Sequence, residues 1–323
     1  LEALSRAPET PEWQDPAWLA RERLPTWREA LERLHAPRSE ADLSPLAPHI
    51  RRLAYDELLA HQLAMAQRKA DRRSDPAPRI MAGAKAQAVI EALPFRFTGA
   101  QARSLAEIRA DLAAGERMSR LIQGDVGSGK TVVAMAAMAD VADGGGQVAL
   151  MAPTEILARQ HYETIAAPLT EQGVAVTLLT GRDKGVGRAE KLRALASGAV
   201  QVAVGTHALF QDDVAFHRLE LAVIDEQHRF GVAERQRLQA KGPAVHLLAM
   251  SATPIPRTLE LTVYGDLDVS RIDEKPPGRT PVATRAAPMG RLAEVEARLR
   301  GAVEQGAQAF WICPLVSESE IVD

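Results

Sequence analysis

The residues best suited to chemistry form one octapeptide, Gly124-Asp125-Val126-Gly127-Ser128-Gly129-Lys130-Thr131. It matches the phosphate-loop pattern G-x-x-x-x-G-K-[ST] at every required position. Glycines let successive backbone N–H groups approach phosphate oxygens, Lys130 supplies a positive charge at the β- and γ-phosphates, and Thr131 offers a hydroxyl to Mg²⁺. A strand pattern at 121–123 precedes the octapeptide, and the helix pattern at 131–141 would point its N-terminus at the anion. The octapeptide therefore predicts a nucleoside triphosphate site.

A second group of chemically active residues follows an apolar strand pattern at 219–224. Asp225 and Glu226 are adjacent carboxylates, and the imidazole of His228 comes two residues later. Asp225 would hold the Mg²⁺ shell, and Glu226, which is aimed differently, would polarise a water for attack on the γ-phosphate. Taken alone, an acidic pair at a strand end is more often a solvated sheet edge, because charged side chains mostly stay exposed. Combined with the phosphate loop, the pair favours triphosphate hydrolysis.

These residues need a scaffold, and from about residue 98 the sequence alternates between strand and helix patterns. The strand patterns lie at 120–123, 147–151, 174–179, 200–204, 219–224 and 246–250. The helix patterns lie at 131–141, 155–166, 188–196 and 233–239. Apolar strands that are buried on both faces and joined through helices form a parallel sheet with right-handed crossovers. We therefore predict a doubly wound α/β domain over residues 86–275.

The segment before this domain reads as a connector. Residues 1–49 carry many prolines around short helical stretches, and residues 50–73 fit one long amphipathic helix. The run Asp75-Pro76-Ala77-Pro78 ends that helix, because proline cannot continue it. The excess of basic residues along the helix is more typical of a solvated face than of a nucleic-acid contact. We expect residues 1–85 to form a mainly helical linker.

The segment after the domain begins another unit. Residues 276–281 are rich in proline and read as a stiff connector, 292–303 as a helix and 309–315 as a strand. The sequence begins without a methionine and stops shortly after this apolar strand pattern. We therefore expect residues 276–323 to be the truncated start of a second lobe, and the sequence to be a piece of a longer chain.

Composition limits the classes of function. The chain has 323 residues, of which 46% are hydrophobic and 25% charged, as expected for a globular protein of about two domains. The net charge of −3 gives no overall nucleic-acid signature, so any such contact must be local. The single cysteine, Cys313, excludes an intrachain disulfide. No apolar run is long enough to span a bilayer and no signal peptide is visible, so we expect a cytoplasmic protein without membrane contact.

Further segments fall in the order found in superfamily 2 helicases, and each resembles one of that family's motifs. They are Phe97-Thr98-Gly99-Ala100-Gln101, Ala152-Pro153-Thr154-Glu155, Thr180-Gly181-Arg182, Gly205-Thr206-His207-Ala208-Leu209 and Ser251-Ala252-Thr253. The resemblance implies a RecA-like lobe that uses ATP and Mg²⁺, with adenine recognised by Gln101 beside Phe97. It implies that Thr131 and Asp225 hold the Mg²⁺. It assigns catalysis to Lys130, Asp225, Glu226 and His228.

The same resemblance implies a nucleic-acid surface and a coupling segment. The residues expected to grip the DNA backbone are Pro153, Thr154, Arg159, Gly181, Arg182, Thr206 and His207. The residues expected to couple the nucleotide site to DNA are Ser251, Thr253 and Arg257. Contacts of this kind are mainly to phosphates, so they would bind DNA independently of its sequence.

Longer matches narrow the resemblance to the bacterial members of this superfamily that remodel branched DNA. They lie at 52–59, 225–232, 251–259 and 276–282. The resemblance implies a monomeric ATP-dependent helicase that translocates on double-stranded DNA at stalled forks and Holliday junctions, in recombination and repair. It also implies a wedge domain before Leu1 and an arginine finger after Asp323. Such an arginine accelerates hydrolysis by roughly 10³ to 10⁵, so we expect residues 1–323 alone to be inactive as a helicase.

Two alternatives for the function remain. The motor of a transcription-repair coupling translocase resembles this chain through the phosphate loop and the runs at 228–232 and 254–259, but usually lacks the pattern at 52–59. A DNA-binding module that responds to ATP without hydrolysing it is the other alternative. The intact Lys130 and acidic pair argue against that module.

Four aromatic and histidine residues have two interpretations each. Phe210 and Tyr162 would serve as stacking platforms for bases, although a core position is more typical. His207 and His228 would serve as metal ligands, but no cysteine or histidine cluster lies nearby. We expect His228 instead to bridge the nucleotide and the segment 251–253.

Overall fold

The computed structural model describes residues 10–226, 241–242, 244–253, 267–274, 276 and 282–312. The chain divides into two compact units, Leu1–Pro277 and Gly278–Asp323. Among the described residues, none of the helices combines the length and the apolar character needed to span a bilayer. The predicted helix at 233–239 lies outside the described residues.

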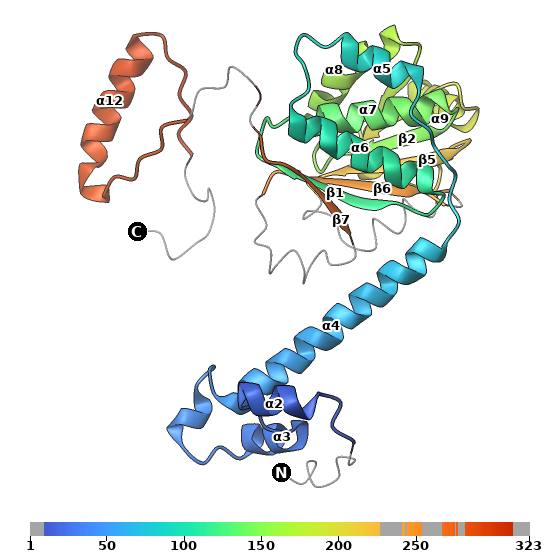
Figure 1. The fold of residues 1–323 in the computed structure, drawn as a ribbon. Coiled ribbons are helices and arrows are strands. Elements are labelled where there is room, and N and C mark those ends of the chain that lie inside the picture. The colour runs from blue at the N-terminus through green and yellow to red at the C-terminus, as the bar shows by residue number, and fades with distance from the viewer. Residues whose placement is uncertain are drawn as a thin grey trace. The chain divides into compact units, whose positions relative to one another are not determined.

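A parallel sheet forms the centre of the larger unit (Figure 1). Its seven described strands run in the order β3-β4-β2-β5-β6-β1-β7, and every neighbouring pair is parallel. The strands are β1 Ser119–Gly124, β2 Gln147–Met151, β3 Val176–Leu179, β4 Val202–Gly205, β5 Leu219–Asp225, β6 His246–Ser251 and β7 Asp268–Ile272. The first six were predicted. The sequence patterns miss β7, because this edge strand mixes buried and exposed residues and lacks an apolar run.

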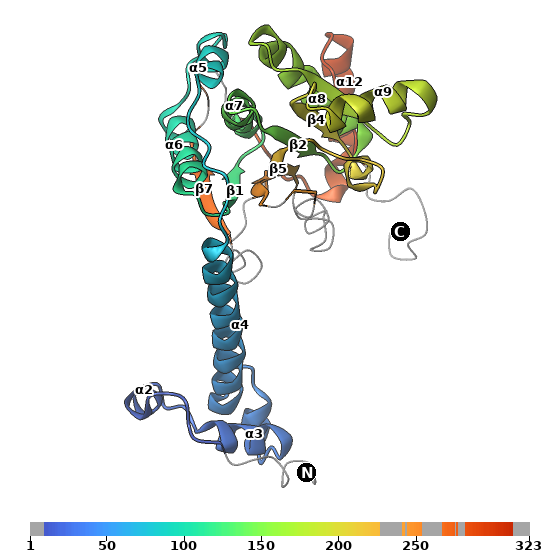
Figure 2. The same ribbon diagram turned by 90° about the vertical axis from the view of Figure 1, so that its right-hand side faces the viewer.

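Helices cover the sheet on both faces. They are α5 Ala84–Glu91, α6 Gly99–Ala114, α7 Lys130–Asp143, α8 Glu155–Glu171 and α9 Gly185–Ala196, with the short helix η2 His207–Phe210. Helices α5 to α8 lie on one side of the sheet (Figure 2) and bury Leu150 and Val223 beneath them. The alternate residues Met151 and Ile224 face the other side, where they pack with α9 and η2. The predicted doubly wound α/β fold is confirmed.

Several predicted boundaries differ from the structure by a few residues, and for α8 and β3 the physical reason is visible. Helix α8 is predicted to end at residue 166, but it runs to Glu171, past Pro168, which lacks the backbone N–H that continues a helix. Ile165 and Leu169 are fully buried on either side of the proline. Burial of two such side chains contributes about 3–6 kcal/mol, which outweighs the proline's cost of about 3 kcal/mol. Strand β3 starts two residues later than predicted, because the Val174 N–H bonds to the Leu169 carbonyl at the helix end.

The segment before the sheet is organised around one buried arginine. Its elements are α2 Pro16–Glu22, α3 Trp27–His35, η1 Glu40–Leu43 and α4 Pro48–Ser74. Arg52 on α4 is fully buried, and its guanidinium forms ion pairs with Asp56 and, at 2.5 Å, with Glu12. The guanidinium also lies 5.5 Å from the centre of the Trp13 ring. Glu12 also accepts the backbone N–H of Trp27 at 2.9 Å. The predicted mainly helical character of residues 1–85 is confirmed, and the buried Arg52 guanidinium connects α4 to the segment that contains Glu12.

The smaller unit contains a single long element among its described residues. The short helix η4, Met289–Arg291, leads into α12, Leu292–Glu304, where a helix was predicted. The predicted strand at 309–315 is not seen in its described part, residues 309–312. A strand needs a hydrogen-bonded neighbour, and the described part of this unit offers none.

His246 is a fully buried imidazole at the start of β6 that joins three segments of the larger unit. Its Nδ1 accepts the backbone N–H of Met118 at 3.1 Å, so Nε2 carries the proton and donates it to the Pro78 carbonyl at 3.1 Å. Burial lowers the pKa of His246, because it disfavours the charged ring more than the Pro78 carbonyl and Asp111 favour it.

We predict that His246 makes the folded state less stable in acid. Its folded pKa lies below the ordinary value of 6.5, so its stabilising effect is fully present above pH 6.5 and is lost as the pH falls toward the folded pKa. One proton changes the free energy of unfolding by at most about 1.4 kcal/mol per pH unit. His246→Gln should flatten this dependence in urea unfolding between pH 5 and 8, whereas His35→Gln, at an exposed site, should not. The same slope in both variants would contradict the assignment.

Candidate nucleotide-binding site

The phosphate loop lies where β1 ends and α7 begins. Gly127 and Gly129 have φ angles of 74° and 93°, which side chains other than glycine rarely adopt. A Cβ at position 129 would also lie 2.2 Å from the Gln101 amide nitrogen. The Ser128 N–H bonds to the Asp125 carbonyl at 3.1 Å and closes the turn. The glycines predicted from the pattern are therefore required by the shape of the loop itself.

Lys130 is held inside this loop. Its ammonium group donates to the carbonyl oxygens of Gly124 at 2.7 Å and Asp125 at 3.0 Å, and the residue is 9% exposed. Burial lowers the pKa of Lys130, and the nearby carboxylates of Asp225, Glu226 and Asp125 act in the opposite direction. The lysine and the acidic pair therefore belong to one electrostatic site, as predicted from the sequence.

The acidic pair lies at the end of β5, and its two carboxylates are held differently. Asp225 Oδ2 lies 2.7 Å from Nε2 of His161 on α8, and both side chains are 12% exposed. Glu226 has a φ of 51°, a left-handed conformation that costs about 1–2 kcal/mol outside glycine. Strained residues of this kind cluster at functional sites. His228 lies outside the described residues, so its predicted role stays a prediction.

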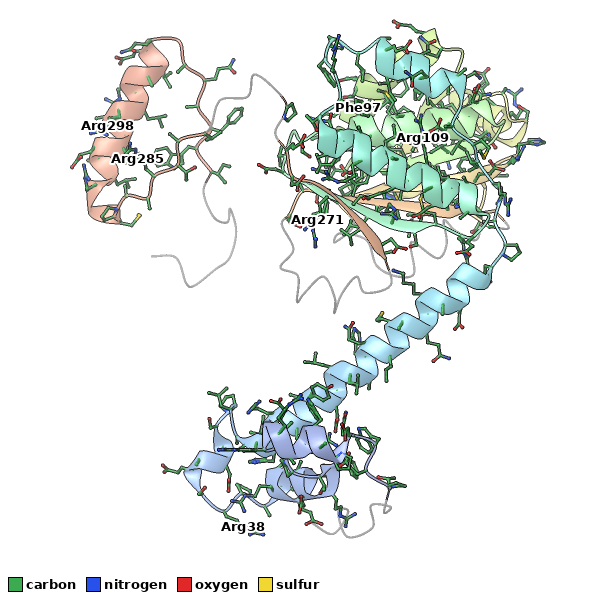
Figure 3. The ribbon with its side chains drawn as sticks, viewed as in Figure 1. Arg38, Phe97, Arg109, Arg271, Arg285 and Arg298 are labelled. Carbon is green, nitrogen blue, oxygen red and sulfur yellow. The ribbon has the colours of Figure 1, made fainter. Side chains whose placement is uncertain are left out.

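Gln101 joins the start of α6 to the phosphate loop. Its amide nitrogen donates to the Ser128 carbonyl at 2.7 Å, and its amide oxygen accepts the Thr98 N–H at 2.9 Å. The Gln101 N–H in turn donates to the Thr98 hydroxyl at 3.2 Å, which completes a capping box. Phe97, labelled in Figure 3, packs against the hydrophobic core that α6 helps to form. One amide hydrogen and one oxygen lone pair of Gln101 remain for the adenine contact, which stays a prediction.

The coupling segment adjoins the phosphate loop through a chain of hydrogen bonds. The Ser251 and Thr253 hydroxyls are 2.9 Å apart, and the Thr253 carbonyl accepts the Gln123 side-chain amide at 3.3 Å. The Gln123 amide oxygen accepts the Arg271 Nε–H at 3.3 Å. A cavity of about 350 Å³ opens between the ends of β1, β6 and β7 beside this chain. Arg257 lies outside the described residues.

The residues predicted to grip DNA lie at the carboxyl ends of β2, β3 and β4. The Thr154 hydroxyl caps α8 by accepting the Leu157 N–H at 3.3 Å. One carboxylate, that of Glu155, pairs with both Arg159 at 2.9 Å and Arg182 at 3.0 Å. The other members of the set, Pro153, Gly181, Thr206 and His207, follow the same strand ends, and Thr206 is buried. The two arginines form the accessible charged part of the predicted surface.

The structure identifies polar residues that the sequence motifs do not single out. The imidazole of His161 bonds to Asp225, and the amide of Gln123 bonds to the Thr253 carbonyl. The guanidinium of Arg271 bonds in turn to Gln123. No spacing in the sequence separates them from ordinary solvent-facing polar residues. Phe210 is buried in the cluster that contains Met151 and Ile224, and the half-buried Tyr162 packs against the cluster on the other face of the sheet, so the core interpretation of both aromatic residues is confirmed.

The donor set fits a Mg²⁺–nucleotide complex. Mg²⁺ is usually bound through one or two carboxylates, phosphate oxygens and waters. The Thr131 hydroxyl on the first turn of α7 and the Asp225 carboxylate supply oxygen donors of this type. The described residues contain no cluster of three or more histidine, cysteine or acidic side chains that would hold a metal without phosphate.

Comparison with known proteins identifies a family. The family model described as DEAD/DEAH box helicase matches residues 98–262. This range contains the phosphate loop, the acidic pair and the segment 251–253.

Curated relatives and a solved structure extend the similarity beyond this range. RecG, the ATP-dependent DNA helicase of Escherichia coli O157:H7, is 49% identical over 92% of this chain, and RecG of Bacillus subtilis strain 168 is 46% identical over 93%. The chain spans 44% of the length of each of these relatives. A structure of RecG bound to a three-way DNA junction matches 95% of the chain and 41% of its own, with a TM-score of 0.79 and 41% identity. The resemblance drawn from the sequence motifs is confirmed.

We predict that Lys130→Ala and Glu226→Gln affect nucleotide chemistry differently. Loss of the Lys130 charge should weaken binding of a fluorescent ATP analogue severely, whereas Glu226→Gln should retain Mg²⁺-dependent binding and slow hydrolysis, since general base catalysis contributes about 10²–10⁴-fold. Equilibrium titration and single-turnover hydrolysis separate the two effects. Lys85→Ala, on α5 and 3.9 Å from Asp143, is the matched control. Loss of binding in Glu226→Gln would show that its assigned role is wrong.

Proposed function

Because the chain belongs to the DEAD/DEAH box helicase family, we propose that it forms the ATP-binding part of a helicase that acts on branched DNA. The observation that carries the proposal is the meeting of a complete phosphate loop with an acidic pair, close enough for both carboxylates to act on the pKa of Lys130. The similarity to RecG helicases, and to RecG bound to a three-way junction, supports branched DNA as the substrate.

Each residue at the nucleotide site has one task in this function. Lys130 leaves the loop carbonyls to contact the β- and γ-phosphates of ATP, and Gln101 recognises the adenine beside Phe97. Thr131 and Asp225 hold Mg²⁺, which when bound neutralises charge on the phosphates. Glu226, whose backbone is in the left-handed conformation, orients and deprotonates the attacking water.

DNA is held through its phosphates, independently of sequence. Arg159 and Arg182 reach solvent from two segments and are kept together by Glu155. The Glu155 carboxylate offsets the positive charge of both arginines. Without it the two guanidinium groups would repel one another. Exchange of Glu155 for phosphate oxygens would then fix the DNA backbone at the start of α8.

The proposed function assigns a different part of the helicase to each of three segments of the chain. Residues 86–275 form the first RecA-like lobe, residues 1–85 link it to a wedge domain, and residues 276–323 begin the second lobe. Closure of two lobes around ATP drives translocation of a monomeric protein along duplex DNA in the cytoplasm. The two alternatives, a transcription-repair coupling translocase and a module that never hydrolyses ATP, are not favoured by the comparisons.

The proposed function predicts ATP turnover that depends on DNA structure. In the natural protein, a three-way junction should stimulate turnover more strongly than linear duplex of equal length. Added salt should reduce the stimulation, because phosphate contacts release counterions. Steady-state ATPase assays test this, with Lys130→Ala as the control for contaminating activity. Equal stimulation by junction and linear duplex would contradict a branched substrate.

A further prediction concerns the segment 251–253. Ser251→Ala combined with Thr253→Ala should leave ATP binding nearly intact and disconnect hydrolysis from DNA movement, because the two hydroxyls bond to each other in a segment whose Thr253 carbonyl accepts the amide of Gln123, the residue before the loop. The measurement compares fork unwinding with ATPase in the natural protein, with Thr170→Ala at an exposed site of α8 as the control. Equal loss of both activities would indicate a direct catalytic or purely structural role.

A further inference from the structure

His161 connects the metal-binding carboxylate to a helix whose start is predicted to contact DNA. It lies in the second turn of α8, and its Nε2 is 2.7 Å from Asp225 Oδ2. An ionised carboxylate can only accept hydrogen bonds, so Nε2 donates and His161 occupies one of the two carboxylate oxygens. The contact is largely shielded from water, since each side chain is 12% exposed.

Helix α8 is suited to transmit a displacement over this short distance. Ala158, Ile165 and Leu169 are fully buried in the core, so the helix is packed along its length rather than resting on the surface. Thr154 caps its start, and Arg159 lies two residues before His161. Packed elements move as units because core side chains have few alternative arrangements. A shift at the first turn of α8 therefore reaches His161 directly.

The sheet order places the His161–Asp225 contact between the predicted DNA-binding residues and the predicted nucleotide-binding residues. Helix α8 follows β2, whose neighbour β5 ends in Asp225. The predicted DNA contacts follow β2, β3 and β4, while the nucleotide residues follow β5 and β1. The His161–Asp225 hydrogen bond crosses from α8 to the acidic pair.

We propose that His161 is a positioning residue that fixes the Asp225 carboxylate for Mg²⁺ and links this metal site to DNA bound at the start of α8. The proposal rests on the proposed function, because it takes Asp225 as a Mg²⁺ ligand and α8 as a DNA contact. A hydrogen bond to one oxygen of a ligating carboxylate sets the direction of the other, and removing such a bond typically costs about 10- to 100-fold in metal affinity or activity. DNA that shifts α8 changes the Mg²⁺ affinity, and Mg²⁺ changes the DNA affinity by the same factor.

The experiment measures Mg²⁺-dependent binding of fluorescent ADP to the natural protein, without turnover. The variants are His161→Leu, which removes the donor, His161→Gln, whose amide N–H replaces Nε2–H, and Glu163→Gln, an exposed control on the same helix. Each is titrated with ADP in EDTA and then with Mg²⁺ at fixed ADP. Affinity in EDTA should be equal in all four proteins. The Mg²⁺ concentration for half-maximal binding should rise about 10-fold or more in His161→Leu, recover in His161→Gln and stay at the wild-type value in Glu163→Gln.

The same titrations with three-way junction DNA test the link. DNA should shift the half-maximal Mg²⁺ concentration of the wild-type protein and leave that of His161→Leu unchanged. An unaltered Mg²⁺ requirement in His161→Leu would overturn the positioning role, and a retained DNA shift in that variant would overturn the link. Equal loss of affinity in EDTA and in Mg²⁺ for both His161 variants would show a purely structural contact and overturn both. Wild-type protein that binds ADP without any Mg²⁺ dependence would refute the assignment of Asp225 as a Mg²⁺ ligand, and wild-type protein that binds no ADP would instead refute the proposed nucleotide site.

Discussion

All strands of the sheet run in the same direction, and this constraint decides where the chemistry can lie. The carboxyl ends of parallel strands meet at one edge, so the loops that follow them share a surface. The phosphate loop, the acidic pair and the segment 251–253 follow β1, β5 and β6. The predicted DNA contacts follow β2, β3 and β4 at the same edge. The residues predicted to bind nucleotide and those predicted to bind DNA are therefore neighbours by topology, and the two sets meet at the β2–β5 pair.

Side-chain hydrogen bonds at both ends of α6 fix this helix beside the phosphate loop. Asp140 on α7 is 1% exposed and accepts both the Gly83 N–H at 2.8 Å and the Arg109 guanidinium (Figure 3). At the other end of α6, the carboxylate of Glu274 accepts the Ala100 N–H at 3.2 Å, one residue before Gln101. The helix that supports the phosphate loop is thus anchored at both ends, by α7 and by the chain that leaves β7.

The sequence predicts those parts of the fold and site whose physical cause is local. Six strands and the phosphate loop follow from apolar runs and from glycines with positive φ. The capping box of Thr98 and Gln101 is a clear helix-start signal for α6, yet the resemblance assigned Gln101 to adenine alone, and α6 was not predicted. Edge strand β7 and the partnership of His161 with Asp225 depend on neighbours distant in sequence, which no local pattern encodes.

The burial of Arg52 separates two kinds of electrostatic interaction in this chain. Its side chain is fully shielded, and those of Glu12 and Asp56 are 21% and 11% exposed, so dissolved ions screen these pairs weakly. Arg159 and Arg182 have side chains 52% and 81% exposed, where counterions reach them readily. Rising ionic strength would therefore weaken the proposed phosphate contact at these two arginines while the buried pairs of Arg52 persist. Salt would act on the proposed DNA surface and leave the helical segment folded.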